Sequence, residues 1–152
     1  MNSIIEFRGT YSFLSNFFNL QNPVDHNGLK FWTVEHAYQS AKTFDKKDKL
    51  VIQSLNSASE AKKYGKTVDI RSDWSSVKEV IMLDLVSQKF FNNSELMGRL
   101  LLTGKAEIIE GNYWHDNFWG QCFCKSCTKL SDPARNILGC ILMAIRDHIP
   151  TK

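Results

Sequence analysis

The sequence predicts an α+β domain that is mostly helical and carries a few short strands. Helix-start signals and apolar residues at helical spacing recur from residue 33 onward, whereas strand-forming segments are short and lie mainly before it. No internal repeat, low-complexity tract or Pro/Gly-rich linker interrupts the 152 residues. Since domains typically hold about 100–200 residues, we expect a single domain over residues 1–152.

The first part of the chain is expected to contain most of the strands. Residues 4–7 are rich in strand-forming Ile and Phe, and an aromatic loop follows at residues 11–18. Farther on, the pair Asn27-Gly28 favours the positive φ angles of a tight hairpin turn. We therefore expect a short two-stranded ribbon over residues 24–31.

Capping signals locate the first two helices. Thr33 is a suitable N-cap for a helix that runs to about residue 44. Ser57 and Glu60 have the spacing of a capping box, and Gly65 stands where that second helix would end.

Three further helices and one strand complete the expected order. Asp73 is expected to cap a long helix over residues 74–91, and residues 94–103 to form another. Residues 106–109 are strand-like. The last helix is expected to begin at Asp132-Pro133, because the N–H that proline lacks is one that a first helical turn leaves unpaired.

The charge balance argues against a protein that binds duplex DNA. The chain has 19 Lys and Arg residues and 16 Asp and Glu residues, for a net charge of +3. This charge is too small for a DNA-binding surface on composition alone, but it suits an anionic ligand. No apolar run approaches the ~20 residues of a membrane span, and the N-terminus lacks the features of a signal peptide. We expect a cytoplasmic protein with no membrane association and no obligate protein partner.

Four cysteines raise the question of zinc. Cys122, Cys124 and Cys127 form a close group, with Cys140 as a possible fourth ligand. Structural zinc sites more often consist of two separated Cys-x-x-Cys pairs. We therefore expect no metal and no cofactor, and zinc binding by these cysteines stays an open alternative. His115 is assigned no role, because on a regular element it would project away from the residue that follows it.

The first expected helix carries the most informative residues. Glu35, Tyr38, Gln39 and Lys42 share one face at positions i, i+3, i+4 and i+7. One interpretation is a surface helix whose polar face meets water. The other, favoured by the large aromatic rings of Trp32 and Tyr38, is a site that brings an acid and an amine together. Burial would then raise the pKa of the carboxyl group and lower the pKa of the amine.

A series of short segments extends this pattern over nearly the whole chain. Their order and spacing are specific, although each is weak alone, and they consist of Phe13, Ser15, Asn16, Phe17, Gly28, Phe31, Trp32, Glu35, His36, Tyr38, Gln39, Lys42, Gly65, Lys66, Val68, Arg71, Asp73, Trp74, Lys89, Phe90, Thr103, Gly104, Glu110, Asp116, Trp119, Gly120, Asn136, Leu138, Gly139 and Arg146. On these residues the chain resembles the NADAR family of small N-glycosidases linked to NAD and ADP-ribose metabolism. Lys66 departs from the Gly-Arg pair that the family often has, and lysine lacks the planar fork with which arginine binds phosphate.

The resemblance implies hydrolysis of the bond between C1′ of a ribose and a ring nitrogen. The substrate we expect first is ADP-ribosylated guanine in nucleic acid or nucleotides. The alternatives are a ribosylamino-pyrimidine phosphate of riboflavin synthesis, or a non-catalytic module that binds ADP-ribose or nucleotides.

Three residues are the expected catalytic groups. Cleavage places positive charge on the ribose and negative charge on the leaving nitrogen, so two carboxyl groups, those of Glu35 and Asp116, are expected to stabilise the two ends. Lys42 either holds a phosphate or orients Glu35, or else attacks C1′ and forms a Schiff base, which is the role we favour.

Substrate binding is expected to need stacking rings, cations for phosphate and polar groups for the ribose or base. Trp74 and Trp119 are expected to stack on a base, and Arg8, Arg71 and Lys78 to bind phosphate. The other residues assigned to substrate binding are Asn16, Phe17, Tyr38 and Gln39.

Overall fold

The computed structural model describes residues 2–149 of the chain. These residues form two compact units: unit 1 holds the N-terminal residues up to Ser15 together with those from Met97 onward, and unit 2 holds Asn16–Leu96. Helices predominate in the described residues and every strand is short, so the expected α+β class is confirmed. Among these residues, no helix combines the length and the apolar character needed to cross a lipid bilayer.

Unit 2 contains the predicted hairpin. Strand β2 (Val24–His26) pairs antiparallel with β3 (Leu29–Phe31). The turn between them has φ of 53° at Asn27 and 81° at Gly28, which are the positive values that this pair of residues favours. Gly28 N–H also donates to Asp25 Oδ1 at 3.0 Å.

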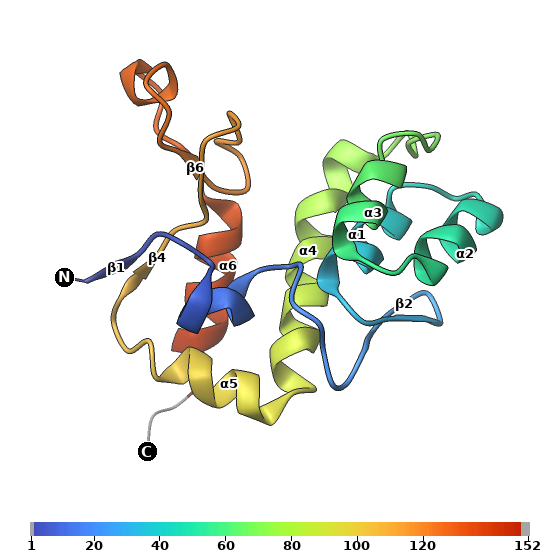
Figure 1. Cartoon of the computed structure of the whole chain (residues 1–152), viewed down its shortest axis with the longest axis horizontal. Coiled ribbons are helices and arrows are strands. Elements are labelled where there is room, and N and C mark those ends of the chain that lie inside the picture. The colour runs from blue at the N-terminus through green and yellow to red at the C-terminus, as the bar shows by residue number, and fades with distance from the viewer. Residues whose placement is uncertain (1, 150–152) are drawn as a thin grey trace. The chain divides into compact units, whose positions relative to one another are not determined.

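Four helices make up most of unit 2, and α1 lies in their midst. They are α1 (Val34–Ala41), α2 (Lys46–Ser54), α3 (Ala58–Tyr64) and α4 (Trp74–Phe91). Helix α1 packs against the other three (Figure 1), and all of its residues are buried. The interpretation of α1 as a surface helix is therefore wrong, because both its polar and its apolar faces meet protein.

In unit 2 the predicted caps are present with one exception. Thr33 Oγ1 accepts the His36 N–H at 3.1 Å, and Ser57 with Glu60 forms the reciprocal capping box of α3. Asp73 stands at the N-cap of α4, but its side chain makes no capping hydrogen bond, because both carboxylate oxygens accept from a neighbouring arginine. Helix α2 was not expected, although its signal was in the sequence, since Asp45 accepts N–H groups of its first turn.

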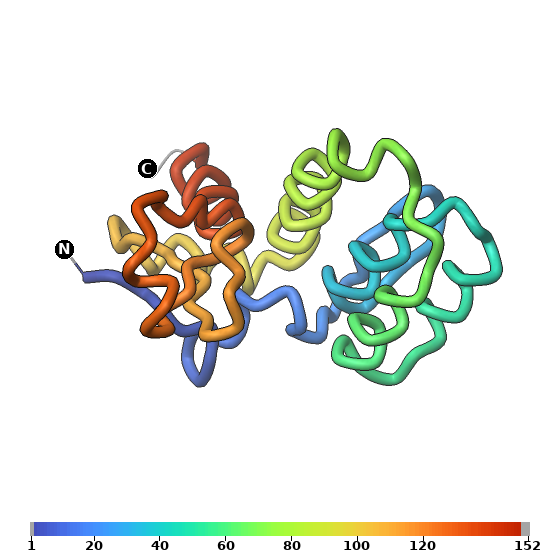
Figure 2. Tube along the Cα trace, turned by 90° about the horizontal axis from the view of Figure 1, so that it is seen from above, coloured from blue at the N-terminus to red at the C-terminus, as the bar shows by residue number. Residues whose placement is uncertain are grey.

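Unit 1 joins the two ends of the described chain. Strand β1 (Ser3–Ile4) pairs parallel with β4 (Glu107–Ile108), so that the N-terminal segment lies beside the later part of the chain (Figure 2). Strand β5 (Gly111–Asn112) pairs parallel with β6 (Gln121–Cys122). The remaining elements are two 3-10 helices and two α-helices: η1 (Gly9–Leu14), η2 (Cys127–Lys129), α5 (Ser94–Leu101), whose residues are divided between the two units after Leu96, and α6 (Ile137–Asp147).

The start of α6 corrects a prediction. The helix begins at Ile137, and not at Asp132-Pro133. Its N-cap residue, Asn136, is left-handed with φ of 46°, which separates the preceding loop from the helix. Asn136 Oδ1 accepts the Glu110 N–H at 3.1 Å and its Nδ2 donates to Ile108 O at 2.9 Å. These long-range bonds fix the helix start, and no local capping signal encodes them.

Candidate functional site

Side chains of α1 and its neighbours in unit 2 form a group that we call the Glu35 cluster. Four of its members come from α1 or its C-cap, one from the segment before β2, and one from the first position of α4. They are Asn16, Glu35, Tyr38, Gln39, Lys42 and Trp74. The structure thus brings together six of the predicted site residues.

Glu35 is held at the centre of the cluster. Its side chain accepts a hydrogen bond of 2.6 Å from Gln39 Nε2, and its backbone N–H donates to Asn16 O at 3.0 Å. Burial raises the pKa of Glu35, while the Gln39 hydrogen bond and the positive charges of Lys62 and Lys42 oppose that rise. The pKa of Glu35 is therefore raised overall, with burial as the largest cause.

Lys42 lies at the C-terminal end of α1, over the ring of Tyr38. Its Nζ is 5.5 Å from the Tyr38 ring centroid, and the Tyr38 ring meets the Trp74 ring with centroids 5.1 Å apart. Burial lowers the pKa of Lys42; Glu35 opposes this effect and the nearby Lys62 adds to it. The expected directions for the acid and the amine are both confirmed, and they raise the neutral fraction of each group.

Three buried oxygens have no hydrogen-bond partner within the described residues. They are Asn16 Oδ1, Gln39 Oε1 and Ser40 Oγ. An unsatisfied buried polar group costs about 1–3 kcal/mol, and natural proteins contain few of them. Two of the three, Asn16 Oδ1 and Gln39 Oε1, belong to the Glu35 cluster.

Gly65 supports the cluster from the end of α3. A Cβ placed on Gly65 would collide with Gln39 Oε1 and lie 2.8 Å from Gln39 Cδ. Gly65 is the C-cap of α3 as expected, yet its φ is −61°, so helix termination does not require glycine here. The residue is small because the Gln39 side chain occupies the adjoining space.

The remaining predicted binding residues of unit 2 are Arg71, Lys78 and Phe17, and they differ in their contacts and exposure. Arg71 forms two hydrogen bonds with Asp73, at 2.6 and 2.8 Å, and its guanidinium lies 4.3 Å from the Phe44 ring centroid. One edge of its fork is thus already paired, so a phosphate contact would use the other edge. Lys78 is partly buried on α4, and Phe17 is 40% exposed.

Three predicted site residues lie in unit 1. Asp116 Oδ1 accepts the N–H groups of Phe118 and Trp119 at 3.0 and 2.9 Å, so this carboxylate shapes its own loop. Trp119 packs edge-on against Phe118 with ring centroids 4.9 Å apart. Arg8 is exposed at the start of η1. The roles of these residues in catalysis or binding stay predictions.

Lys62 is a residue that sequence reasoning missed. It lies on α3, its Nζ is 5.8 Å from the Phe17 ring centroid, and its charge acts on the pKa values of both Glu35 and Lys42. The available signal was its position one helical turn before Gly65, a motif residue, since residues three apart share a helix face.

The chain is similar to known proteins along most of its length. The NADAR domain model matches residues 6–150. The N-glycosidase YbiA of Escherichia coli (strain K12) is 29% identical over 154 residues, covering 97% of this chain and 89% of YbiA. The NMR structure of E. coli YbiA matches with a TM-score of 0.77 and 31% identity, covering 97% of this chain and 85% of that chain.

Two further relatives carry different names. The N-glycosidase Npun_R5314 of Nostoc punctiforme is 35% identical over 125 residues, covering 78% of this chain and 75% of that protein. The chloroplastic riboflavin biosynthesis protein PYRR of Zea mays is 31% identical over 166 residues, covering 97% of this chain but 25% of the maize protein. With the family model spanning both units and the fold shared with YbiA, this chain belongs to the NADAR domain family and is an N-glycosyl hydrolase.

Proposed function

We propose that this protein releases ADP-ribose from ADP-ribosylated guanine, in nucleic acid or in nucleotides, by hydrolysing the bond between ribose C1′ and the base. The observation that carries the proposal is the pairing, on one helix, of buried Glu35 with partly buried Lys42. The pKa of Glu35 is raised and that of Lys42 is lowered, and each shift favours the neutral form of its group. The buried acceptor oxygens beside them have no partner among the described residues.

The unpartnered oxygens favour a ligand rich in donors. Asn16 Oδ1 and Gln39 Oε1 are both acceptors. The Watson–Crick edge of guanine presents an N–H and an amino group, and a ribose presents hydroxyl groups. A guanine or a ribose therefore supplies the donors that these two oxygens lack, and the Tyr38 and Trp74 rings offer faces on which a base can stack.

Cations near the same helix suit the diphosphate of ADP-ribose. Lys62 and Lys66 lie close enough to Lys42 to lower its pKa. The repulsion between these two positive charges and Lys42 is unfavourable in the free protein and is relieved when an anion binds between them. We assign the diphosphate to this side of α1, with Arg71 as a further contact through its unpaired edge.

Glu35 and Lys42 divide the reaction between them. The neutral amine of Lys42 attacks C1′ of the ribose, the C1′–N bond breaks, and the base leaves with a proton supplied by an acid. The ribose ring oxygen takes up a proton as the ring opens, and the product is a protonated Schiff base between Lys42 and C1′. Glu35 stabilises the positive charge that develops at C1′. Water then adds to the Schiff base, which releases ADP-ribose, restores the neutral amine of Lys42 and returns a proton to the acid that had protonated the base.

A second candidate function follows from one comparison. The maize relative is named as a riboflavin biosynthesis protein, so a ribosylamino-pyrimidine phosphate is the alternative substrate. It carries a single phosphate and no adenosine. The two functions therefore predict different products from the same catalytic groups.

A product assay on both substrates tests these proposals. We expect ADP-ribose from ADP-ribosylated guanosine or DNA, loss of that activity in Glu35→Gln and Lys42→Ala, and normal activity in Lys47→Ala, which alters an exposed lysine of α2. Borohydride should trap an enzyme–sugar adduct on the wild type and not on Lys42→Ala. Release of ribose 5-phosphate from the pyrimidine substrate alone would favour the second function. Binding of ADP-ribose without cleavage of either substrate would favour a non-catalytic module and refute both.

A further inference from the structure

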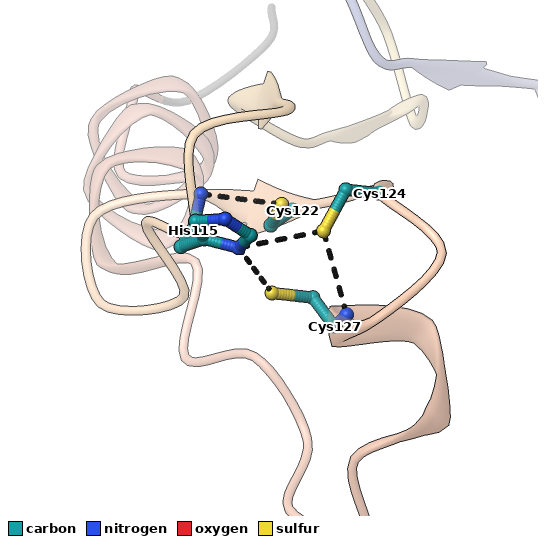
Figure 3. Close-up of side chains that lie close together, drawn as sticks. All are labelled: His115, Cys122, Cys124 and Cys127. Carbon is teal, nitrogen blue, oxygen red and sulfur yellow. Dashed lines mark hydrogen bonds between the residues drawn. The ribbon is translucent and has the colours of Figure 1, made fainter.

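A second group of reactive side chains lies in unit 1 and has no part in the proposed chemistry. It consists of His115, Cys122, Cys124 and Cys127, which we call the Cys/His cluster. The nitrogen and sulfur atoms of these four residues lie within 4.8 Å of one another, and Figure 3 shows their side chains turned toward each other. We propose that the Cys/His cluster is a structural zinc site.

The distances are close to those of a tetrahedral site. Zinc lies about 2.3 Å from thiolate sulfur and about 2.0–2.1 Å from imidazole nitrogen, which sets two ligand atoms about 3.6–3.8 Å apart. His115 Nδ1 is 3.2 Å from Cys127 Sγ and 3.4 Å from Cys124 Sγ. The largest separation, at most 4.8 Å, needs a contraction of about 1 Å, which side-chain rotation can supply.

The backbone around the cluster already supports negatively charged sulfur. The Cys127 N–H donates to Cys124 Sγ at 3.4 Å, and the His115 N–H donates to Cys122 Sγ at 3.3 Å. Ser126 Oγ also lies 3.2 Å from Cys124 Sγ. Such N–H groups stabilise metal-bound thiolates and orient them toward the metal. Here they are present at two of the three cysteines.

The conformation of His115 is a separate observation that points to the same site. Its φ is 68°, a left-handed value that is uncommon for residues other than glycine and often occurs at functional sites. Asn112 fixes this loop, because its Oδ1 accepts the N–H groups of Trp114 and Asp116 at 3.2 Å each. No role was expected for His115, because a regular element would have pointed the ring elsewhere, and the left-handed backbone removes that reason.

The ligand set favours zinc over other ions. Three thiolates and one imidazole form a soft site that disfavours Mg²⁺ and Ca²⁺, whereas iron–sulfur clusters usually take four cysteines. Four protein ligands leave no position for substrate, which is typical of structural zinc. Cys140 is outside the set: it is exposed on α6, and its Sγ lies 3.8 Å from Arg135 O. The fourth member of the cluster is therefore His115, in place of the Cys140 considered from the sequence.

Zinc at this position would hold the segment that carries Asp116 and Trp119. The segment from His115 to Cys127 contains one short strand, β6, and ends at the first residue of η2, so little regular structure fixes it. A closed zinc site in such a segment contributes directly to its folding. The inference concerns the stability of unit 1 and holds whichever substrate the enzyme takes.

Metal analysis of the full chain, purified without a histidine tag, tests the proposal. We expect one zinc per chain in the wild type and in Cys140→Ser, and loss of the metal in Cys127→Ser and in His115→Ala. Cobalt added to the metal-free wild type should give the intense visible and near-ultraviolet bands of tetrahedral thiolate coordination. Substoichiometric zinc together with no such spectrum under reducing conditions would overturn the proposal, as would a Cys140→Ser variant that loses its metal.

A second measurement avoids any variant that fails to fold. Alkylation of the thiols, followed by mass spectrometry, should modify Cys140 rapidly in the zinc-loaded wild type. The other three cysteines should react only after a chelator is added. Equal protection of all four thiols with and without chelator would contradict zinc ligation.

Discussion

Gly65→Ala should disturb the Glu35 cluster, although Gly65 itself is not among the groups assigned to the substrate. The added methyl group collides with the Gln39 side chain, which is 2% exposed and has little room to move. Overpacking of this kind costs about 1–3 kcal/mol. If Gln39 rotates away instead, its 2.6 Å hydrogen bond to Glu35 breaks, and a bond to a charged group contributes about 1.5–3 kcal/mol. Either response weakens unit 2 at the site.

Loss of the Gln39–Glu35 hydrogen bond should also shift the pH dependence of the reaction in a defined direction. The Gln39 hydrogen bond lowers the pKa of Glu35 against the effect of burial, so its removal raises that pKa. Where ionised Glu35 is needed for catalysis, the acidic limb of the rate profile moves to higher pH. The matched control is Gly98→Ala on α5, where an added Cβ meets nothing within 4 Å and where alanine should add about 0.5–1 kcal/mol of helix stability.

Thermal unfolding and pH–rate profiles of both variants provide the assay. We expect Gly65→Ala to melt lower by roughly 2–4 °C for each kcal/mol lost, and Gly98→Ala to melt no lower than the wild type. In a Gln39→Ala background the Gly65→Ala change should cost less, with a coupling of about 0.5–3 kcal/mol. A Gly65→Ala enzyme with unchanged melting, unchanged profile and no coupling to Gln39 would refute this account of Gly65.

Three further outcomes follow from the described contacts. Glu35→Gln should unfold at a higher urea concentration than the wild type at neutral pH, and this difference in urea midpoint should disappear below about pH 4.5. The pKa of Glu35 is raised in the folded protein from 4.5, so the wild type loses stability as the pH rises from 4.5 through the folded-state pKa. A difference in urea midpoint that grows in acid would contradict the burial of Glu35. Lys62→Met should raise the pKa values of both Glu35 and Lys42, moving the whole pH–rate profile upward, while Lys63→Met on the exposed side of α3 should leave it in place. Asn136→Ala should lower the free energy of unfolding in urea by about 3 kcal/mol, because it removes two side-chain hydrogen bonds and places alanine in a left-handed conformation. Asn136→Gly should cost about 1 kcal/mol less, because glycine adopts that conformation without strain and loses only the hydrogen bonds. Equal losses in the two variants would show that the backbone conformation is not strained.

Local signals predicted the elements that local interactions determine. The Thr33 and Ser57 caps and the Asn27-Gly28 turn depend on residues within four positions of one another, and each is present as expected. The start of α6 depends instead on Asn136, whose side chain binds backbone groups about 26 and 28 residues away. No pattern within the helix itself contains that information.

The same distinction applies to the sites. Helical periodicity placed Glu35, Gln39 and Lys42 on one face, and that part of the site could be read from spacing. Periodicity did not say whether water or protein met the face, because α1 is buried by helices that follow it in the chain. His115 was missed since its left-handed backbone breaks the regular geometry on which such reasoning depends.

The cost of the Glu35 cluster to the free protein is itself an argument that it binds a ligand. A buried carboxyl group, a partly buried amine and the Gln39 amide oxygen, which has no partner among the described residues, lie on α1 or at its C-cap, and a second such oxygen belongs to Asn16 in the segment before β2. Simple stability would favour apolar residues at each of these positions, since an unsatisfied buried polar group costs about 1–3 kcal/mol. Active sites commonly retain such unfavourable groups, because substrate repays their desolvation. A ligand that satisfies Asn16 and Gln39 and neutralises the lysines should therefore stabilise unit 2 more than its contact area alone would suggest.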